Sequence, residues 1–145
     1  MDSKNYDLLR LENMLSFPLY ACSKEIIKQY KPYLDKLDLT YTQYITMLAL
    51  WEHQTLTVKD LGQYLYLDSG TLTPLLKKLE NKGFITRKRS ESDERNVIVR
   101  ITDTGKQLQD EALMIPEKIL SLTTMDQEEL KSLYHILNKL LKHVE

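Results

Sequence analysis

The residues with the most distinctive chemistry are hydroxyl and basic side chains in the segment from Asp68 to Gly83. Its leucines recur at i, i+3, i+4 and i+7, which predicts a helix capped by Asp68 or Ser69 with one apolar side. Five polar residues remain on the other side: Ser69, Thr71, Thr73, Lys77 and Lys78. The free N–H groups at a helix N-terminus favour phosphate, and Ser, Thr and Lys side chains reach base edges in a major groove. This side is therefore a candidate DNA-binding surface, although the same residues also suit the solvated face of an ordinary surface helix.

Two short strands with basic residues follow this helix. Phe84–Arg89 and Val97–Ile101 flank a charged turn, and the second strand alternates in the way that predicts a β-hairpin. Arg87 lies on the first strand and Arg95 near the tip, where Asp93 is placed to orient its guanidinium. Narrow minor grooves concentrate negative potential and attract arginine. The hairpin is thus a second candidate DNA contact, and the alternative is a tip that mixed charge merely keeps soluble.

The distribution of charge supports a localised phosphate-binding face. The whole chain has a net charge of −1, but between Lys77 and Arg100 eight Lys and Arg residues stand against four Asp and Glu residues. The rest of the chain must therefore carry a net charge of −5. Such asymmetry is typical of a face that attracts an anionic partner, whereas uniform mixing indicates a solvated surface.

The elements that position these residues form the order helix, turn, helix, hairpin, which is the layout of a winged helix. Thr57 is a good N-cap for the first of the two helices, with Asp60 three residues later. Other helices are predicted over about 8–34, where Pro18 introduces a bend, over about 42–52, from about 102 until Pro116 kinks or ends the helix, and from about 124. The fold class expected is mainly α with a small β-hairpin wing. The apolar stripes of the first and last helices are wide enough to pack against a second copy of the chain.

Composition excludes several classes of protein. The 145 residues suit a single domain, and no apolar run approaches the roughly 20 residues of a membrane helix. The N-terminus lacks the apolar core of a secretory signal, and one cysteine fits a reducing cytoplasm. The three scattered His and the single Cys provide no zinc spacing, and no phosphate-cradling glycine loop or catalytic constellation is present. We therefore expect a cytoplasmic protein that is not an enzyme and has no cofactor.

The segments Leu67–Glu80 (LDSGTLTPLLKKLE) and Asp93–Arg95 (DER) strongly resemble the MarR family of bacterial transcription regulators. Within that family the chain is similar to the organic-hydroperoxide sensors and their staphylococcal relatives. The resemblance covers nearly the whole chain, including Leu15–Tyr20 (LSFPLY) and Leu39–Tyr44 (LTYTQY). It implies a single MarR-type domain over residues 1–145, with dimerisation helices over about 1–38 and 106–145 and a winged helix-turn-helix over about 39–105.

A homodimer of this kind places two recognition helices in successive major grooves of a pseudopalindromic operator, about 10 bp apart. The resemblance implies that Ser69, Thr71, Thr73 and Lys78 face the DNA. It also implies that Arg95 enters the minor groove with Asp93 bracing it. The expected role is that of a repressor.

The resemblance breaks at residue 16, where the peroxide sensors have a reactive cysteine and this chain has Ser16. The surrounding tyrosines of the family are present as Tyr20, Tyr30 and Tyr41. Tyr20 neighbours Ser16 within one helix, whereas Tyr30 is about 21 Å further along the axis, so its contact must come from a partner subunit. Serine cannot be oxidised to sulfenic acid as cysteine can. The chain is then either a deliberate Cys→Ser replacement held in a reduced-like, DNA-binding state or a natural member that lost peroxide sensing.

Three alternatives remain open. In the first, Cys22 carries the redox response in place of Ser16, but it lies on the apolar stripe, where a thiol usually acts as a small hydrophobe. A MarR-type regulator released by a small phenolic ligand would also use the tyrosines. A winged helix that only docks other proteins would show no salt-dependent DNA affinity, whereas phosphate contacts require one.

Overall fold

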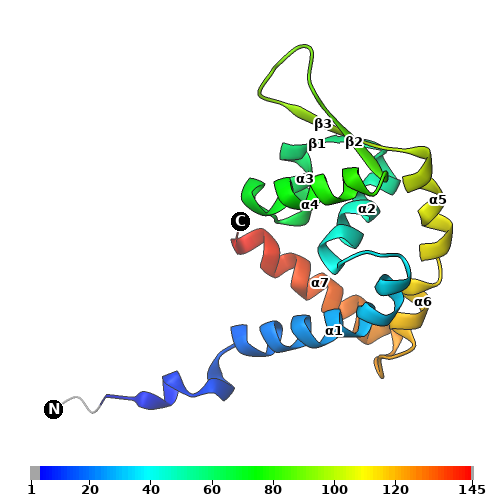
Figure 1. The fold of residues 1–145 in the computed structure, drawn as a ribbon. Coiled ribbons are helices and arrows are strands. Elements are labelled where there is room, and N and C mark those ends of the chain that lie inside the picture. The colour runs from blue at the N-terminus through cyan, green and yellow to red at the C-terminus, as the bar shows by residue number, and fades with distance from the viewer. Residues whose placement is uncertain (1–3, 145) are drawn as a thin grey trace. The chain divides into compact units, whose positions relative to one another are not determined.

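The computed structural model describes residues 4–144 as a mainly helical chain with one small antiparallel sheet (Figure 1). Contacts between residues divide it into two compact units, Met1–Ile115 and Pro116–Glu145. The first unit holds the winged helix together with the N-terminal helix, and the second holds the C-terminal helices. Residues 1–3 and 145, at the ends of the predicted dimerisation segments, lie outside the described residues. The assignment of both terminal segments to one MarR-type domain stays a prediction.

The N-terminal helix begins later than the sequence pattern predicted. Two short 3₁₀ turns, η1 (Tyr6–Leu9) and η2 (Leu11–Asn13), precede α1 (Ser16–Lys36). The predicted continuous helix from residue 8 was therefore wrong, and Pro18 provides the reason. In a helix that started at residue 8, Pro18 would lie in the interior, lack the N–H that bonds the carbonyl of Met14 and clash with it. In the first turn of α1 the missing N–H breaks no intrahelical bond.

Three further helices build the core of the first unit: α2 (Tyr41–His53), α3 (Val58–Leu65) and α4 (Ser69–Asn81). Each starts at a polar cap. Thr40 and Gln43 form a reciprocal capping box at α2, and Thr57 accepts a hydrogen bond from the backbone N–H of Asp60 at α3, as predicted. Of the two candidates for α4, Asp68 is the cap. The apolar sides of these helices meet in a core of fully buried residues that includes Met47, Leu50, Leu61, Leu72, Leu76 and Leu79.

The turn from α4 into the sheet depends on Gly83. Its φ of 82° is the left-handed conformation that the sequence predicted for this position. The N–H of Gly83 donates to the carbonyl of Glu80, and the N–H of Phe84 donates to the carbonyl of Leu79. This pair of bonds ends α4 and turns the chain back along it.

Three strands form the sheet in the order β1-β3-β2. The predicted hairpin is confirmed, with β2 (Ile85–Arg89) antiparallel to β3 (Val97–Ile101). The third strand, β1 (Thr55–Thr57), was not predicted, because three residues are too few to show alternation; it pairs with the other edge of β3. In Figure 1 the turn that connects β2 and β3 extends beyond α3 and α4.

The segment after the sheet forms α5 (Asp103–Ala112), which packs closely on the base of the hairpin. A Cβ at Gly105 would overlap the carbonyl oxygen of Phe84, so only glycine fits there. The carbonyl of Gly105 also accepts a hydrogen bond of 2.8 Å from the indole N–H of Trp51, which ties α2 to α5.

The second unit contains α7 (Gln127–Val144) and most of α6 (Ile115–Leu120). Pro116 lies in the first turn of α6. Helix α5 ends at Ala112 and a new helix begins at Ile115, which is one of the two outcomes predicted for this proline. The last helix starts three residues later than predicted, because Asp126 and Glu129 cap each other's backbone N–H groups. Within residues 127–144 no side chain of α7 is buried.

None of the helices in the described part of the chain is both long enough and apolar enough to cross a membrane.

Candidate nucleic-acid interface

The polar side of α4 presents all five residues that the sequence singled out. Ser69, Thr71, Thr73, Lys77 and Lys78 are exposed, while the leucines on the other side are buried. The Asp68 carboxylate accepts the backbone N–H of Thr71 at 2.7 Å. This bond, together with one from the Thr71 side chain, holds the pKa of Asp68 below its usual value. The Thr73 hydroxyl donates to the carbonyl of Ser69, so its lone pairs remain available to accept.

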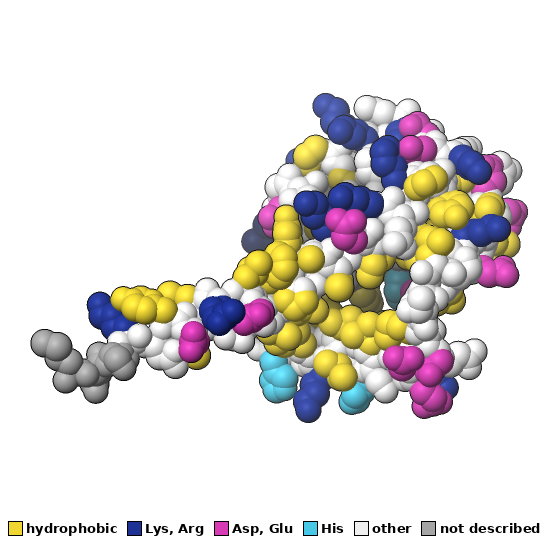
Figure 2. All heavy atoms as spheres, turned by 90° about the horizontal axis from the view of Figure 1, so that it is seen from below, with side chains coloured by type: hydrophobic (Ala, Val, Ile, Leu, Met, Phe, Trp, Pro, Cys, Tyr) yellow, Lys and Arg dark blue, Asp and Glu magenta, His cyan; other side chains and the backbone are white. Residues whose placement is uncertain are grey.

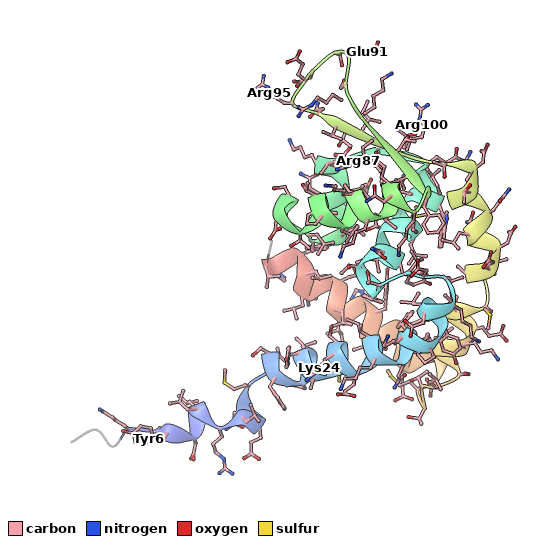
Figure 3. The ribbon with its side chains drawn as sticks, viewed as in Figure 1. Tyr6, Lys24, Arg87, Glu91, Arg95 and Arg100 are labelled. Carbon is pink, nitrogen blue, oxygen red and sulfur yellow. The ribbon has the colours of Figure 1, made fainter. Side chains whose placement is uncertain are left out.

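Arg95 stands at the tip of the wing (Figure 3). Asp93 lies beside it. The side chain of Arg95 is 93% exposed, and its Nε lies 3.5 Å from an Asp93 carboxylate oxygen. The same oxygen accepts the backbone N–H of Arg95 at 3.0 Å. The tip is closed by a bond of 2.7 Å from the N–H of Ser90 to the carbonyl of Asn96. Arg95 is therefore an exposed cation on an ordered turn, with one side of its guanidinium held by a carboxylate.

Arg87, the other arginine predicted to contact DNA, is engaged within the protein. Its guanidinium Nη2 donates to Glu80 at 3.2 Å, its backbone N–H donates to the second Glu80 oxygen at 3.0 Å, and its side chain is only 24% exposed. The hydrogen bond from the Arg87 side chain is the main cause of a lowered pKa at Glu80. From the sequence, Glu80 was counted only as a charge, and its pairing with Arg87 was not predicted. Gly83 could have indicated that pairing, because its left-handed turn folds β2 back along the last turn of α4.

Side chains from α3, α4 and the wing border one open hollow of about 420 Å³. The polar residues around it are Lys59, Ser69, Thr73, Arg87, Arg89, Arg95 and Asn96. The structure thus brings the start of α4 and the tip of the wing to one cationic surface. Lys59 was not among the predicted site residues, and no pattern in the sequence marks it. Arg89 was not predicted as a site residue either, although it lies on the basic strand of the hairpin predicted to contact DNA. Thr71, Lys77 and Lys78 lie on α4 outside the lining of this hollow.

The residues of the predicted sensing pocket lie in two separate places within one chain. Ser16 is the exposed first residue of α1, and Tyr20, one turn later, is 63% exposed. Tyr30 and Tyr41 are together instead, with ring centroids 5.2 Å apart, and Tyr44 joins them at 5.8 Å from Tyr30. Tyr44 was missed, although its spacing of three from Tyr41 puts both on one side of α2.

The three clustered tyrosines share a perturbed environment. Burial raises the pKa of Tyr30, Tyr41 and Tyr44 above the ordinary value. The charge of Tyr41 raises the pKa of Tyr30 further, and the charges of both neighbours raise that of Tyr44. All three side chains are therefore neutral hydrogen-bonding groups at physiological pH.

The apolar side of the N-terminal segment remains exposed in the single chain, as the hydrophobic side chains on the N-terminal arm in Figure 2 show. Leu8 is 71% exposed and Leu15 is 69% exposed. Cys22 is exposed as well. Within residues 4–144, no group of three or more His, Cys, Asp or Glu side chains is placed to hold a metal ion.

Comparison with known proteins identifies the family. A family model described as transcriptional regulator SarA/Rot matches residues 28–112. The organic hydroperoxide resistance transcriptional regulator of Bacillus subtilis (strain 168) is 55% identical over 142 residues, which cover 98% of this chain and 96% of that protein. The chain belongs to the SarA/Rot transcriptional regulators of the MarR family.

Other members of the MarR family support the same assignment. The HTH-type transcriptional regulator SarZ of Staphylococcus saprophyticus is 47% identical over 119 residues, which cover 82% of each chain. The structure of reduced AbfR bound to DNA, a protein of Staphylococcus epidermidis, has a TM-score of 0.77 at 37% identity and covers 96% of each chain. The predicted family and the winged-helix fold class are confirmed, and these relatives are regulators rather than enzymes.

Proposed function

We propose that this MarR-family regulator is a repressor that binds a pseudopalindromic double-stranded DNA operator as a homodimer in the cytoplasm. The observation that carries the proposal is the cationic hollow where the hydroxyl-bearing start of α4 and the arginine-bearing wing tip meet. Double-stranded DNA is the ligand that such a pairing fits, because a helix N-terminus suits a major groove and an exposed arginine suits a minor groove. The likeness to AbfR, solved in complex with DNA, supports the same partner.

In this proposal each side chain has a role set by its position. Ser69, Thr71 and Thr73 approach base edges or phosphates from the first turns of α4, and Lys77 and Lys78 meet the phosphate backbone further along. Arg95 enters the minor groove while Asp93 holds its guanidinium. A homodimer is supported by the exposed leucines of the N-terminal segment, which need a second surface to leave water.

The finer part of the proposal concerns Ser16. We place this serine where the peroxide-sensing relatives have their cysteine, so the chain retains a small hydroxyl but cannot be oxidised. A partner's tyrosine cluster would accept or donate a hydrogen bond to that hydroxyl as it would to a reduced thiol. The name of the Bacillus subtilis relative and the existence of AbfR in reduced and disulfide forms support a redox signal in this family. The chain as it stands is then fixed in the DNA-binding state.

The test of this role compares the chain with Ser16→Cys. Fluorescence anisotropy on DNA from upstream of the chain's own gene is measured with and without an organic hydroperoxide. We expect both proteins to bind and only Ser16→Cys to release DNA on oxidation. Release of the unmodified chain would instead identify Cys22 as the reactive thiol, and Cys22→Ser would then abolish the response. If neither protein responds, residue 16 is not the sensing position, and the tyrosine cluster should be screened with phenolic ligands.

The DNA contacts are tested separately. Arg95→Ala is expected to weaken operator binding about tenfold, because one groove contact is worth about 1–3 kcal/mol. Arg100→Ala is the matched control, since it removes the same charge from β3 at a position outside the lining of the cationic hollow. Equal affinities for Arg95→Ala and the unmodified chain would exclude the wing contact.

Sequence reading by α4 has its own test. Thr71→Ala should change the preference between operator variants more than the affinity for random DNA, because base contacts rather than phosphate contacts specify sequence. A uniform loss over all sequences would show that Thr71 meets only phosphate.

A further inference from the structure

We infer that Glu80 and Arg87 are positioning residues that fix the wing relative to the recognition helix α4, so that both enter their grooves in one register. The inference deepens the proposed function and rests on it, because it assigns the geometry of DNA reading to a pair of side chains that need not touch DNA. It also changes the role of Arg87 from a DNA contact to an internal brace.

The geometry of the pair is that of a clamp. Both carboxylate oxygens of Glu80 accept from Arg87, one from the guanidinium at 3.2 Å and one from the backbone N–H at 3.0 Å. Hydrogen bonds between ionised groups are stronger and more directional than neutral ones. The Glu80 side chain is 35% exposed and the Arg87 side chain 24%, so water screens the pair only partly. One bond reaches the β2 backbone itself, which fixes the strand as well as the side chain.

The position of the clamp along the hairpin explains why it is needed. The base of β2 is already fixed by the turn at Gly83 and by the hydroxyl of Thr102, which donates to the Gly83 carbonyl. From Arg87 the strand continues for two residues, about 7 Å, before the tip begins. The tip is bonded mainly to itself, through Ser90, Asn96 and the Asp93–Arg95 pair. Without the clamp, a small rotation at the base would move Arg95 by a larger distance at the tip.

The negative charge of Glu80 also supports a positioning role. Arg87 lines the cationic hollow, and Glu80 places a carboxylate beside it. An anion there repels phosphates within a Debye length of about 8–10 Å. A surface evolved only to attract DNA would lack that carboxylate. Its presence is explained if the geometry it imposes contributes more to binding than its charge removes.

Charge and positioning predict opposite effects of a Glu80 substitution on operator affinity, so a direct experiment separates them. Operator affinity is measured by fluorescence anisotropy for the unmodified chain, Glu80→Gln and Glu91→Gln. Glu91 provides the matched control because it lies on the exposed hairpin turn, with a side chain 93% exposed and only a 4.0 Å contact to Lys88 (Figure 3). On charge alone both substitutions should leave affinity unchanged or raise it. As a positioning residue, Glu80→Gln should lower affinity about tenfold, because it replaces the charged acceptor of both bonds by a neutral amide.

A second readout separates positioning from general loss of stability. If Glu80→Gln releases the wing, Arg95→Ala should cost little more in that variant, because the minor-groove contact is already lost. Thr71→Ala should retain its full effect there, since α4 is still in place. Double-mutant cycles measure both couplings, and we expect a large one for Glu80 with Arg95 and a small one for Glu80 with Thr71. Equal couplings would overturn the inference.

Arg87→Lys carries the test if Glu80→Gln does not fold. Lysine keeps the positive charge for a phosphate and the backbone N–H bond to Glu80, but it lacks the guanidinium Nη2 that donates to the other Glu80 oxygen. A positioning role predicts a loss of affinity for Arg87→Lys similar to that of Glu80→Gln, whereas a phosphate contact predicts little change. If the unmodified chain does not bind DNA with a steep salt dependence, the proposed function fails. If that chain binds and both variants bind equally well, only the positioning role of Glu80 and Arg87 is overturned.

Discussion

The region formed by α4 and the hairpin buries its leucines within the chain, whereas the N-terminal segment leaves its apolar side chains in water. In the first region the leucines of α4 are buried, Asp68 caps the helix and Glu80 holds Arg87. In the second region Leu8 and Leu15 are mostly exposed. One chain therefore suffices to build the DNA-reading surface, whereas the segment that precedes it needs another surface to cover its apolar side chains.

The free energy available from covering these side chains is considerable. Fully burying one leucine side chain contributes about 1.5–3 kcal/mol relative to leaving it exposed. Several large apolar side chains of the segment are at least half exposed: Tyr6, Leu8, Leu9, Leu11, Leu15 and Tyr20. Their burial between two copies would stabilise a dimer by more than any single contact within the DNA-reading region.

The largest effect is expected from charges placed on the exposed apolar side. The double substitution Leu11→Asp with Leu15→Asp should dissociate the dimer and reduce operator affinity by about 10²–10⁴-fold, because the two recognition helices would no longer bind together. Sedimentation gives the oligomeric state and anisotropy the affinity. Lys24→Glu changes charge within α1, which begins after both leucines, and should leave the dimer intact. A dimer that survived both aspartates would mean that the N-terminal segment does not form the interface.

The next largest effect should appear in the DNA-reading region and leave the oligomeric state unchanged. Leu79 is fully buried on the apolar side of α4, and Leu79→Ala should lower the free energy of unfolding by about 2–5 kcal/mol. Urea unfolding measures the loss. Leu113→Ala, at an exposed leucine, is the control with the same change of side chain. A similar loss for both variants would contradict the contrast between a completed core and exposed leucines.

A smaller effect tests the connection between the two regions. The Lys82 ammonium, at the end of α4, donates to the carbonyl of Asp38 and lies 3.4 Å from Oε1 of Gln43, so it ties α4 to the corner between α1 and α2. Lys82→Met should cost about 1 kcal/mol of stability, the usual net value of such a hydrogen bond. Lys106→Met, at an exposed position of α5, should be neutral in the same unfolding assay. No difference between these two methionine variants would show that the corner is held without Lys82.

The smallest effect concerns pH. The pKa values of Tyr30, Tyr41 and Tyr44 are raised in the folded chain, mainly by burial, so folding favours the neutral side chains. Their contribution to stability is therefore fully present below the unfolded pKa and is lost as pH rises through the folded values. Stability should fall on going from pH 9 to pH 11, and Tyr30→Phe with Tyr41→Phe should reduce that fall. The tyrosines would be excluded as its cause if Tyr20→Phe reduced it equally.

Local patterns predicted much of the fold and less of the site. The α4 helix, its cap at Asp68, the left-handed Gly83 and the strand Val97–Ile101 follow from residues close in sequence, and the structure has each of them. The helix predicted from residue 8 was wrong, because the leucine spacing was given more weight than the proline that follows it. The short strand β1 was missed because its partner, β3, lies more than forty residues away.

Residue types and short-range periodicity were enough to predict which residues carry charge and hydroxyl groups, where the helices of the winged motif begin, and which family the chain resembles. Which of these residues meet followed only from the three-dimensional structure. It paired Arg87 with Glu80 while leaving Arg95 exposed, and it brought Tyr30 beside Tyr41 and away from Ser16. The physical reason is that pairing depends on the path of the chain through turns such as that at Gly83. Charge and spacing alone do not specify that path.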